Sequence, residues 1–197
     1  LFEDDFSDPD SGWATNDSAD STIRYADDAY ELTLHAATWI ARPIAPRVTC
    51  AECTVEVAGT FLNASEGAMG LLLAERDYND HFLFEVRSDG RYLVQRYADG
   101  QWSTALAPVS SSAIKTTPGE VNHLKAVRQG GKLALFVNDT ALRTVDAPGL
   151  VDAGRLGVMV TSGAEGGITV RYDDFVVRSG AVVGLAKMGS LRRAGDG

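Results

Sequence analysis

The stretch 76–102, RDYNDHFLFEVRSDGRYLVQRYADGQW, decides the fold that this sequence predicts. Two runs in which apolar residues recur at every second position, 81–87 and 91–97, flank the tripeptide Ser-Asp-Gly. An Asp-Gly pair between two such runs is one of the strongest short-range signals of a β-hairpin. We therefore expect two antiparallel strands joined by a tight turn.

The two faces of this hairpin differ in chemistry. Side chains alternate between the faces of a strand, so Phe82, Phe84 and Val86 are expected to face a core. The opposite face mixes aromatic, charged and amide groups, and such groups can stack on sugar rings and bond their hydroxyls. The candidate ligand-binding residues, nearby aromatics included, are Trp39, Tyr78, His81, Glu85, Arg87, Gln95, Tyr97 and Trp102. Alternatively, these side chains cover sandwich edges and a solvated outer face.

Composition limits the classes of function. The chain has 197 residues, of which 45% are hydrophobic and 23% charged, as in a soluble globular protein with one sizeable domain. A net charge of -9 and a pI near 4.7 argue against nucleic acid as a partner, because phosphate binding needs clustered Lys and Arg. The same acidity suits cations or neutral ligands. No apolar run is long enough for a membrane span.

The chain contains two cysteines, Cys50 and Cys53, in the order Cys-Ala-Glu-Cys. Without a second pair, a structural zinc site lacks ligands, and the strand-like residues that follow do not fit a thioredoxin-like motif. We expect a local disulfide in an exported protein, with two reduced thiols as the alternative. The first residue, Leu1, is not Met, which would fit a processed mature form.

Short alternating segments recur about every ten residues up to position 178, and helical periodicity is nearly absent. This pattern predicts an all-β protein in which antiparallel strands form a two-sheet sandwich. We expect one domain, 1–178, followed by a C-terminal tail, 179–197, of different composition.

The order of the sequence motifs resembles the concanavalin A-like, laminin G-like jelly-roll superfamily. It also resembles bacterial extracellular modules of the 3-keto-disaccharide hydrolase-like kind. The resemblance implies a jelly-roll sandwich whose concave face often binds sugars, although many members bind proteins or have a structural role. The motifs that carry it span 2–177 and are DDFSDPDSGW, RDYNDHFLFEV with DGRYLV, VNHLKAV, GGKLALFVND, GRLGVMV and YDDFVV.

One jelly-roll glucanase family carries Glu-x-Asp-x-x-Glu on a concave strand, and 75–80, ERDYND, nearly matches it. Paired carboxylates are the acid and nucleophile of glycoside hydrolysis. The last position here is Asp80 instead of Glu, and Asp-Tyr-Asn-Asp favours a turn. We therefore expect Glu75, Asp77 and Asp80 to be scattered around a loop, and we assign no catalytic residue.

The first and last predicted strands carry matching Asp-Asp-Phe sequences at 4–6 and 173–175. If these strands pair, as the resemblance implies, the carboxylates of Asp5 and Asp173 gather and repel each other. Calcium, a hard cation with oxygen ligands, would relieve this repulsion. The alternative is that the charges of these two strands serve solubility and protect the edge of the sheet.

The tail combines an apolar stripe with two arginines, which indicates docking on a partner. Its segment 188–193, MGSLRR, resembles the C-terminal peptides that load cargo into encapsulin shells, but Ala186 stands where that family usually has Leu. The tail thus predicts contact with a second copy or a shell, and a cytoplasmic location if the encapsulin resemblance holds. The predicted docking residues are Leu185, Met188, Leu191, Arg192 and Arg193.

Together these observations predict a non-catalytic module that binds a glycan or a protein on its concave sheet, exported to the cell surface or beyond. The first alternative is a structural or assembly subunit, either a filament subunit or encapsulin cargo, that docks through its tail. The second alternative is a glycoside-processing enzyme.

Overall fold

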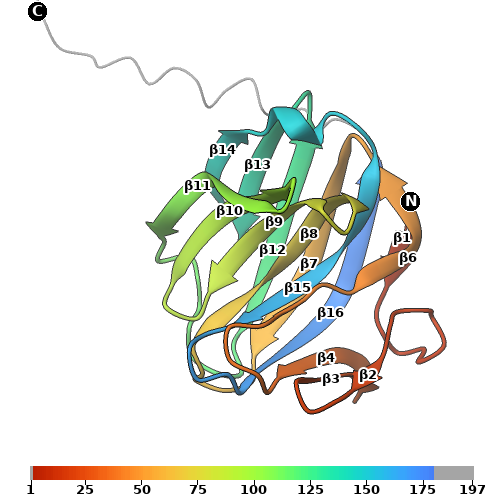
Figure 1. Cartoon of the computed structure of the whole chain (residues 1–197), viewed down its shortest axis with the longest axis vertical. Helices are drawn as coiled ribbons and strands as arrows, with labels where there is room; N and C mark the ends of the chain where they lie inside the picture. Colours follow the sequence, from red (N-terminus) through yellow and green to blue (C-terminus); the bar gives the residue numbers. More distant parts are fainter. Residues whose placement is uncertain (1, 180–197) are drawn as a thin grey trace, which may run out of the picture.

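In a computed structural model, which describes residues 2–179, the chain forms two antiparallel β-sheets that stack on each other (Figure 1). The strands of sheet A are β1 Phe2–Asp4, β2 Asn16–Asp17, β3 Ser21–Ala26, β4 Ala29–Leu34, β7 Cys53–Phe61, β12 Val121–Gln129, β13 Lys132–Val137, β14 Thr140–Asp146 and β16 Ile168–Ser179. Those of sheet B are β5 Ile40–Ala41, β6 Ile44–Cys50, β8 Gly67–Asp77, β9 Asp80–Arg87, β10 Arg91–Ala98, β11 Gln101–Ser110 and β15 Gly154–Ser162.

The strand order in sheet A is β14-β13-β12-β7-β16-β4-β3-β2, with β1 also paired to β16. In sheet B it is β11-β10-β9-β8-β15-β5, with β6 also paired to β15. The predicted all-β jelly-roll sandwich is confirmed. A short 3₁₀-helix, η1 Pro148–Leu150, precedes β15, and residues 2–179 contain no helix long and apolar enough to cross a membrane. The predicted docking residues of the tail lie outside the described residues.

The hairpin expected from the sequence is present as β9 and β10. The turn between them closes with a hydrogen bond from the Gly90 amide to the Arg87 carbonyl (3.0 Å). Gly90 has a φ of +81°, a conformation that side-chain-bearing residues rarely adopt. The predicted faces are also correct, because Phe82, Phe84 and Val86 belong to the main core between the sheets.

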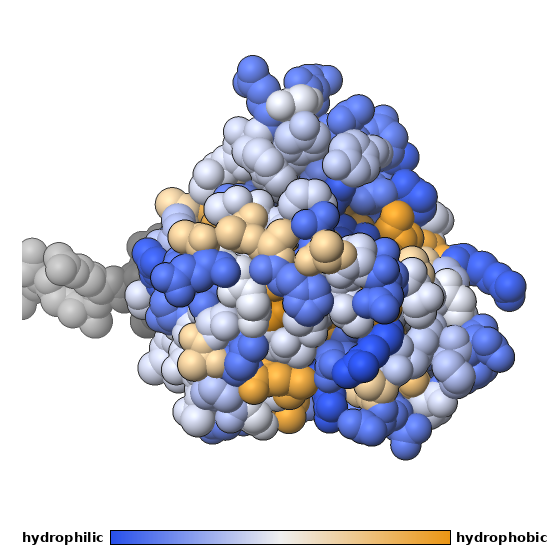
Figure 2. Space-filling model, turned by 60° about the horizontal axis from the view of Figure 1, so that its bottom comes forward, coloured by the Kyte–Doolittle hydropathy of each residue, from blue (hydrophilic) through white to orange (hydrophobic). Residues whose placement is uncertain are grey.

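The inner faces of the two sheets make one hydrophobic core. Large side chains from sheet A, such as Tyr30 and Phe175, pack in the same cluster as Leu71 and Phe84 from sheet B. The outer surface, in contrast, is mostly hydrophilic in the view of Figure 2, with only small apolar patches. Burial of apolar area between the sheets is therefore the main stabilising term of the fold.

The hydroxyl of Tyr172 crosses this core and bonds to the other sheet. Tyr172 lies on β16, is fully buried, and donates a hydrogen bond to the carbonyl of Met159 on β15 (2.6 Å). The same hydroxyl accepts a hydrogen bond from the amide of Gly70 on β8 (2.8 Å). One side chain of sheet A thus satisfies two buried backbone groups of sheet B.

A disulfide joins Cys50 and Cys53 across the turn from β6 to β7, as predicted. Beside it lies the guanidinium of Arg128, which is 1% exposed. Arg128 donates to the carbonyls of Cys50 (2.8 Å), Leu150 (3.3 Å) and Asp152 (3.1 Å). Burial lowers the pKa of Arg128 to about 10, so the side chain stays charged at neutral pH. It thereby ties the disulfide turn to the segment around η1.

We expect Tyr172→Phe to lower the free energy of unfolding by about 1–3 kcal/mol, because it leaves the Gly70 amide and Met159 carbonyl buried without this partner. The shift of the urea midpoint at unchanged m-value measures the effect. Tyr92→Phe is the matched control, because the Tyr92 ring is buried in the same core but its hydroxyl makes no hydrogen bond to the described residues. Equal midpoints for the two variants would contradict this role of Tyr172.

Candidate functional site

The outer face of sheet B carries a transverse row of polar and aromatic side chains. The strand register places Trp102 of β11 beside Tyr97 of β10, Tyr97 beside His81 of β9, and His81 beside Glu75 of β8. Glu75 in turn pairs with Arg155 of β15. This row crosses five of the seven strands of the sheet.

Next to this row lies a cavity of about 300 Å³, which we call the Glu85 cavity. Its walls come from opposite edges of sheet B, since Trp102 lies on edge strand β11 and Trp39 directly precedes edge strand β5. Both tryptophans are 47% exposed, so a ligand can reach their rings. The lining residues are Thr38, Trp39, Ile40, Glu85, Gln95, Trp102, Thr161 and Ser162.

Trp39 is held in place by Ser162. The Trp39 amide donates to the Ser162 hydroxyl (2.9 Å), and the Ser162 amide donates to the Trp39 carbonyl (3.0 Å). The preceding residue, Thr38, has a φ of +51°, which is unfavourable for a β-branched residue. Its amide donates to the Gly163 carbonyl (2.9 Å), which helps to hold this conformation. Strain of this kind persists only where surrounding contacts fix the backbone.

Apolar packing holds the same segment against the sheet. Leu72, Leu83 and Met159 form a small buried cluster apart from the main core, and Ile40 and Ile44 pack on it. These contacts anchor the chain on the outer face of sheet B and bring Trp39 to the cavity.

Trp102 rests on two aromatic neighbours. Its ring centroid lies 5.0 Å from that of Tyr97 and 5.4 Å from that of His81, and His81 stacks on Tyr97 at 5.2 Å. Burial, and then the positive charge of Arg42, lower the pKa of His81 to about 4. The imidazole is therefore neutral at pH 7 and supports the tryptophan as a flat ring.

Glu85 is the charged residue of the cavity, and it is 5% exposed. Its Oε1 atom is buried and has no hydrogen-bond partner among the described residues. Burial raises the pKa of Glu85 to about 7, and the charge of Arg87 offsets this effect only in part. Gly70 is its register partner on β8. A Cβ atom at Gly70 would lie 2.0 Å from the Phe84 carbonyl oxygen and 3.0 Å from the Met159 sulfur, so only glycine fits at this position.

The cavity brings together four of the eight predicted ligand-binding residues, namely Trp39, Glu85, Gln95 and Trp102. His81 and Tyr97 support Trp102 and do not line the cavity. Tyr78 is 73% exposed at the β8–β9 turn, where its ring lies under the Arg42 guanidinium (5.1 Å). Arg87 pairs with Glu66 (3.3 Å) and Asp89 (3.4 Å) outside the cavity.

Four lining residues were not predicted from the sequence, namely Thr38, Ile40, Thr161 and Ser162. Thr38 and Ile40 flank Trp39 along the chain, so proximity to that predicted residue could have identified them. Thr161 and Ser162 lie at the end of β15, and no sequence signal connects them with Trp39.

The carboxylates of the glucanase-like stretch are scattered, as expected, although Glu75 lies within β8 and not in a loop. Its carboxylate pairs with Arg155 (2.7 Å) and Arg42 (3.4 Å). At the turn, Asp77 accepts a hydrogen bond from the Asn79 amide (2.7 Å), and Asp80 pairs with Arg76 (2.7 Å). The charge of Glu75 is thus balanced by two arginines, and Glu75 does not line the Glu85 cavity.

The strands predicted to gather acidic residues do pair, with Asp4 opposite Phe175. However, no group of three or more His, Cys, Asp or Glu side chains within residues 2–179 is placed to hold a metal ion. Asp5 accepts hydrogen bonds from the amide (3.0 Å) and hydroxyl (2.7 Å) of Ser7, which lower its pKa. Burial, and then the negative charges of Asp174 and Asp5, raise the pKa of Asp173, so these carboxylates do lie close enough to repel. Calcium binding at Asp5 and Asp173 stays a prediction.

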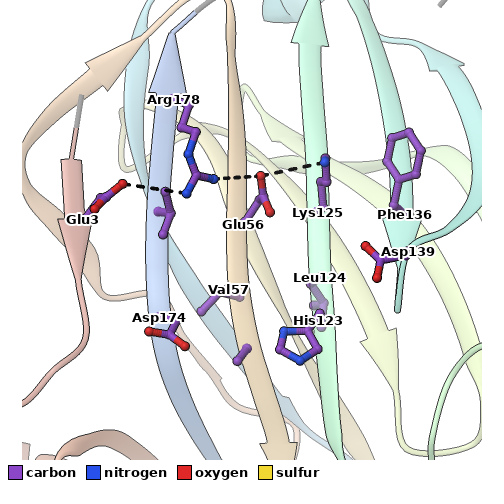
Figure 3. A pocket seen from close by; sticks show the side chains of 12 residues that line it. Glu3, Glu56, Val57, His123, Leu124, Lys125, Phe136, Asp139, Asp174 and Arg178 are labelled. Atoms are coloured by element: carbon purple, nitrogen blue, oxygen red, sulfur yellow. Dashed lines mark hydrogen bonds and ion pairs between the residues drawn. The ribbon is translucent and has the colours of Figure 1, made fainter. Parts of the chain in front are cut away.

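A larger hollow of about 510 Å³ lies on the outer face of sheet A (Figure 3). Four charged side chains cross it in a chain of ion pairs, from Glu3 to Arg178 (3.7 Å), to Glu56 (3.1 Å) and to Lys125 (3.8 Å). Lys125 also covers the Phe136 ring (5.6 Å). Because these charges already have partners and no tryptophan lines the hollow, it is a weaker candidate than the Glu85 cavity.

We expect Glu85→Gln to remove a pH dependence of stability. The folded-state pKa of about 7 lies above the ordinary 4.5, so the folded protein keeps a proton that the unfolded chain releases between these values. The stability of the wild type relative to the variant should therefore be greatest below pH 4.5, fall as the pH rises to 7, and level off above it.

Urea midpoints of both proteins across this pH range measure the difference. His81 acts in the opposite direction, because its lowered pKa makes folding less favourable as the pH falls from 6.5 to about 4. It is present in both proteins, so its contribution cancels. A constant difference between wild type and variant would contradict the raised pKa of Glu85.

No protein-family model matches the chain, and no curated protein matches it in sequence. Solved structures do match. The carbohydrate binding module CBM66 from Bacillus subtilis is 15% identical, with a TM-score of 0.65 over 86% of this chain and 96% of that one. A Bacillus subtilis protein of unknown function with a galectin-like fold is 10% identical, with a TM-score of 0.69 over 91% and 95%.

A Bacillus licheniformis β-glucanase is also similar in structure. It is 10% identical, with a TM-score of 0.65 over 91% of this chain and 98% of that one. At such low identity these similarities establish the fold alone. The chain therefore has the two-sheet jelly-roll sandwich fold that its motifs predicted.

Proposed function

We propose that the protein is a non-catalytic module that binds a glycan in the Glu85 cavity. The observation that carries this proposal is the convergence of two half-exposed tryptophans, from opposite edges of sheet B, on a buried carboxyl group that lacks a hydrogen-bond partner among residues 2–179.

The lining has the chemistry that sugar binding requires. Tryptophan rings pack on the C–H faces of a pyranose, while the carboxyl of Glu85 and the amide of Gln95 can bond its hydroxyls. A volume of about 300 Å³ lies at the lower end of the range for small-molecule sites, roughly 300–1,000 Å³. The cavity thus suits one or two sugar units better than a long chain segment.

A single carboxylate supports binding without hydrolysis. Glycoside hydrolases of the common type use two carboxylates on either side of the scissile bond. Glu85 is the only Asp or Glu among the described residues that line the cavity. The structural neighbours include both a carbohydrate binding module and a glucanase, so the fold itself is compatible with either function.

We further propose that the protein is exported. The Cys50–Cys53 disulfide supports this location, because disulfides persist mainly in oxidising compartments. Mass spectrometry of the protein purified from its native source, with free thiols alkylated before reduction, would test this proposal. Alkylated cysteines would contradict it.

We expect Trp39→Ala and Trp102→Ala each to weaken glycan binding by roughly tenfold or more, since each removes one stacking surface. A glycan array first identifies the bound sugars, and calorimetric titration of a positive sugar then measures the affinity of each variant. Neither substitution should unfold the protein, because both side chains are half exposed.

Tyr78→Ala is the matched control, because Tyr78 is an exposed aromatic residue of the β8–β9 turn outside the cavity, and its loss should leave affinity unchanged. If no glycan binds on the array or in the titrations, the proposed function is refuted. Release of reducing ends from a bound glycan would refute its non-catalytic character.

A further inference from the structure

The carboxyl group of Glu85 is an acceptor that the described part of the protein leaves without a partner. Glu85 is only 5% exposed, and its Oε1 atom makes no hydrogen bond within residues 2–179. Buried polar atoms in native proteins are almost always bonded, so each exception needs an explanation. Because Glu85 lines the cavity, a bound ligand can supply the missing partner.

The surroundings of Glu85 contain no unpaired positive charge. On its own strand the nearest cation is Arg87, whose guanidinium is already paired with Glu66 (3.3 Å) and Asp89 (3.4 Å). Its register partners on the neighbouring strands, Gly70 and Leu93, are uncharged. The remaining lining residues of the cavity are also uncharged. The cavity is therefore complementary to a cation.

The aromatic walls favour a cation as well. Trp39 and Trp102 both line the cavity. The face of an aromatic ring attracts ammonium groups, and tryptophan is the best aromatic residue for this interaction. The net charge of -9 over the whole chain adds a long-range attraction for cationic ligands. An acidic sugar, in contrast, would place a second negative charge beside a carboxylate that has little contact with water.

We propose that the glycan bound in the Glu85 cavity carries a free amino group, whose ammonium pairs with the Glu85 carboxylate between Trp39 and Trp102. This inference rests on the proposed function and specifies its ligand as an amino sugar. A neutral hydroxyl can also bond to Glu85, but it cannot stabilise the ionised form of this buried carboxyl group as an ammonium does. We therefore expect the protein to bind the amino form of a sugar more tightly than its hydroxyl and acetamide forms.

The test is calorimetric titration of the wild type at pH about 6, where primary amines are protonated. The probes are glucosamine, galactosamine and mannosamine, each beside its neutral hexose and its N-acetyl form, with glucuronic acid as the anionic probe. We expect at least one amino sugar to bind about tenfold or more tightly than its two counterparts, since a hydrogen bond to a charged group is worth ~1.5–3 kcal/mol.

Proton release provides a second measurement. Near pH 6 the free carboxyl group of Glu85 is mostly protonated, because its pKa lies at about 7. Binding of an ammonium group favours the ionised form, so we expect close to one proton to be released per sugar. Titrations in buffers of different ionisation enthalpy measure this number.

Glu85→Gln is the matched variant, because it keeps the shape of the side chain and removes its charge. It should bind the amino and neutral sugars with equal affinity and release no proton, and its urea midpoint confirms folding. Glycan binding with no preference for the amine, or a preference that persists in Glu85→Gln, overturns this inference and leaves the proposed function standing. Absence of binding to every glycan of the array overturns both.

Discussion

The Tyr172 hydroxyl joins the two sheets by bonding to β8 and β15. The geometry of the Glu85 cavity depends on these same strands. Tyr172 bonds to Gly70 and Met159, which are register partners on β8 and β15, and Gly70 is also the register partner of Glu85 on β9. A Cβ atom at Gly70 would lie 2.0 Å from the Phe84 carbonyl oxygen. The same glycine that bonds to Tyr172 therefore also allows β8 to pack closely against β9 and Met159.

Two local features that oppose folding occur at this cavity. Thr38 is the one β-branched residue with positive φ among the described residues, and Glu85 is a buried carboxyl group without a partner among them. Each lowers the stability of the native state, and each is enforced by neighbouring contacts, such as those of Ser162 with Trp39. Such local departures from favourable packing and backbone geometry are expected at functional sites, which supports the proposed role of this cavity. Both features occur beside two tryptophans, which distinguishes this cavity from the larger hollow on sheet A, where four charged side chains form ion pairs with one another.

The sequence predicted the fold well because its signals are local. Alternation along β9 and β10 and the Asp-Gly turn determine the hairpin and which of its faces is buried. The site was only half predictable. That Trp39 and Trp102 line one cavity depends on packing of the Ile40 segment on sheet B, and the burial of His81 depends on neighbours from other strands. The outward position of Arg87 was clear, but its pairing with Glu66 is a contact between distant parts of the chain.

A buried carboxyl group with a raised pKa in a sugar-sized cavity is also what a glycosidase requires of its general acid. The distinction between binding and hydrolysis therefore depends on a second carboxylate. One candidate on the neighbouring strand, Glu75, is the register partner of His81, four positions from Glu85 on β9. At ~3.3 Å per residue the two backbone positions are roughly 13 Å apart, and Glu75 does not line the cavity. Glu75 is also paired with Arg155 and Arg42, and Glu85 is the only Asp or Glu among the described residues that line the cavity, which supports the proposal of a binding site.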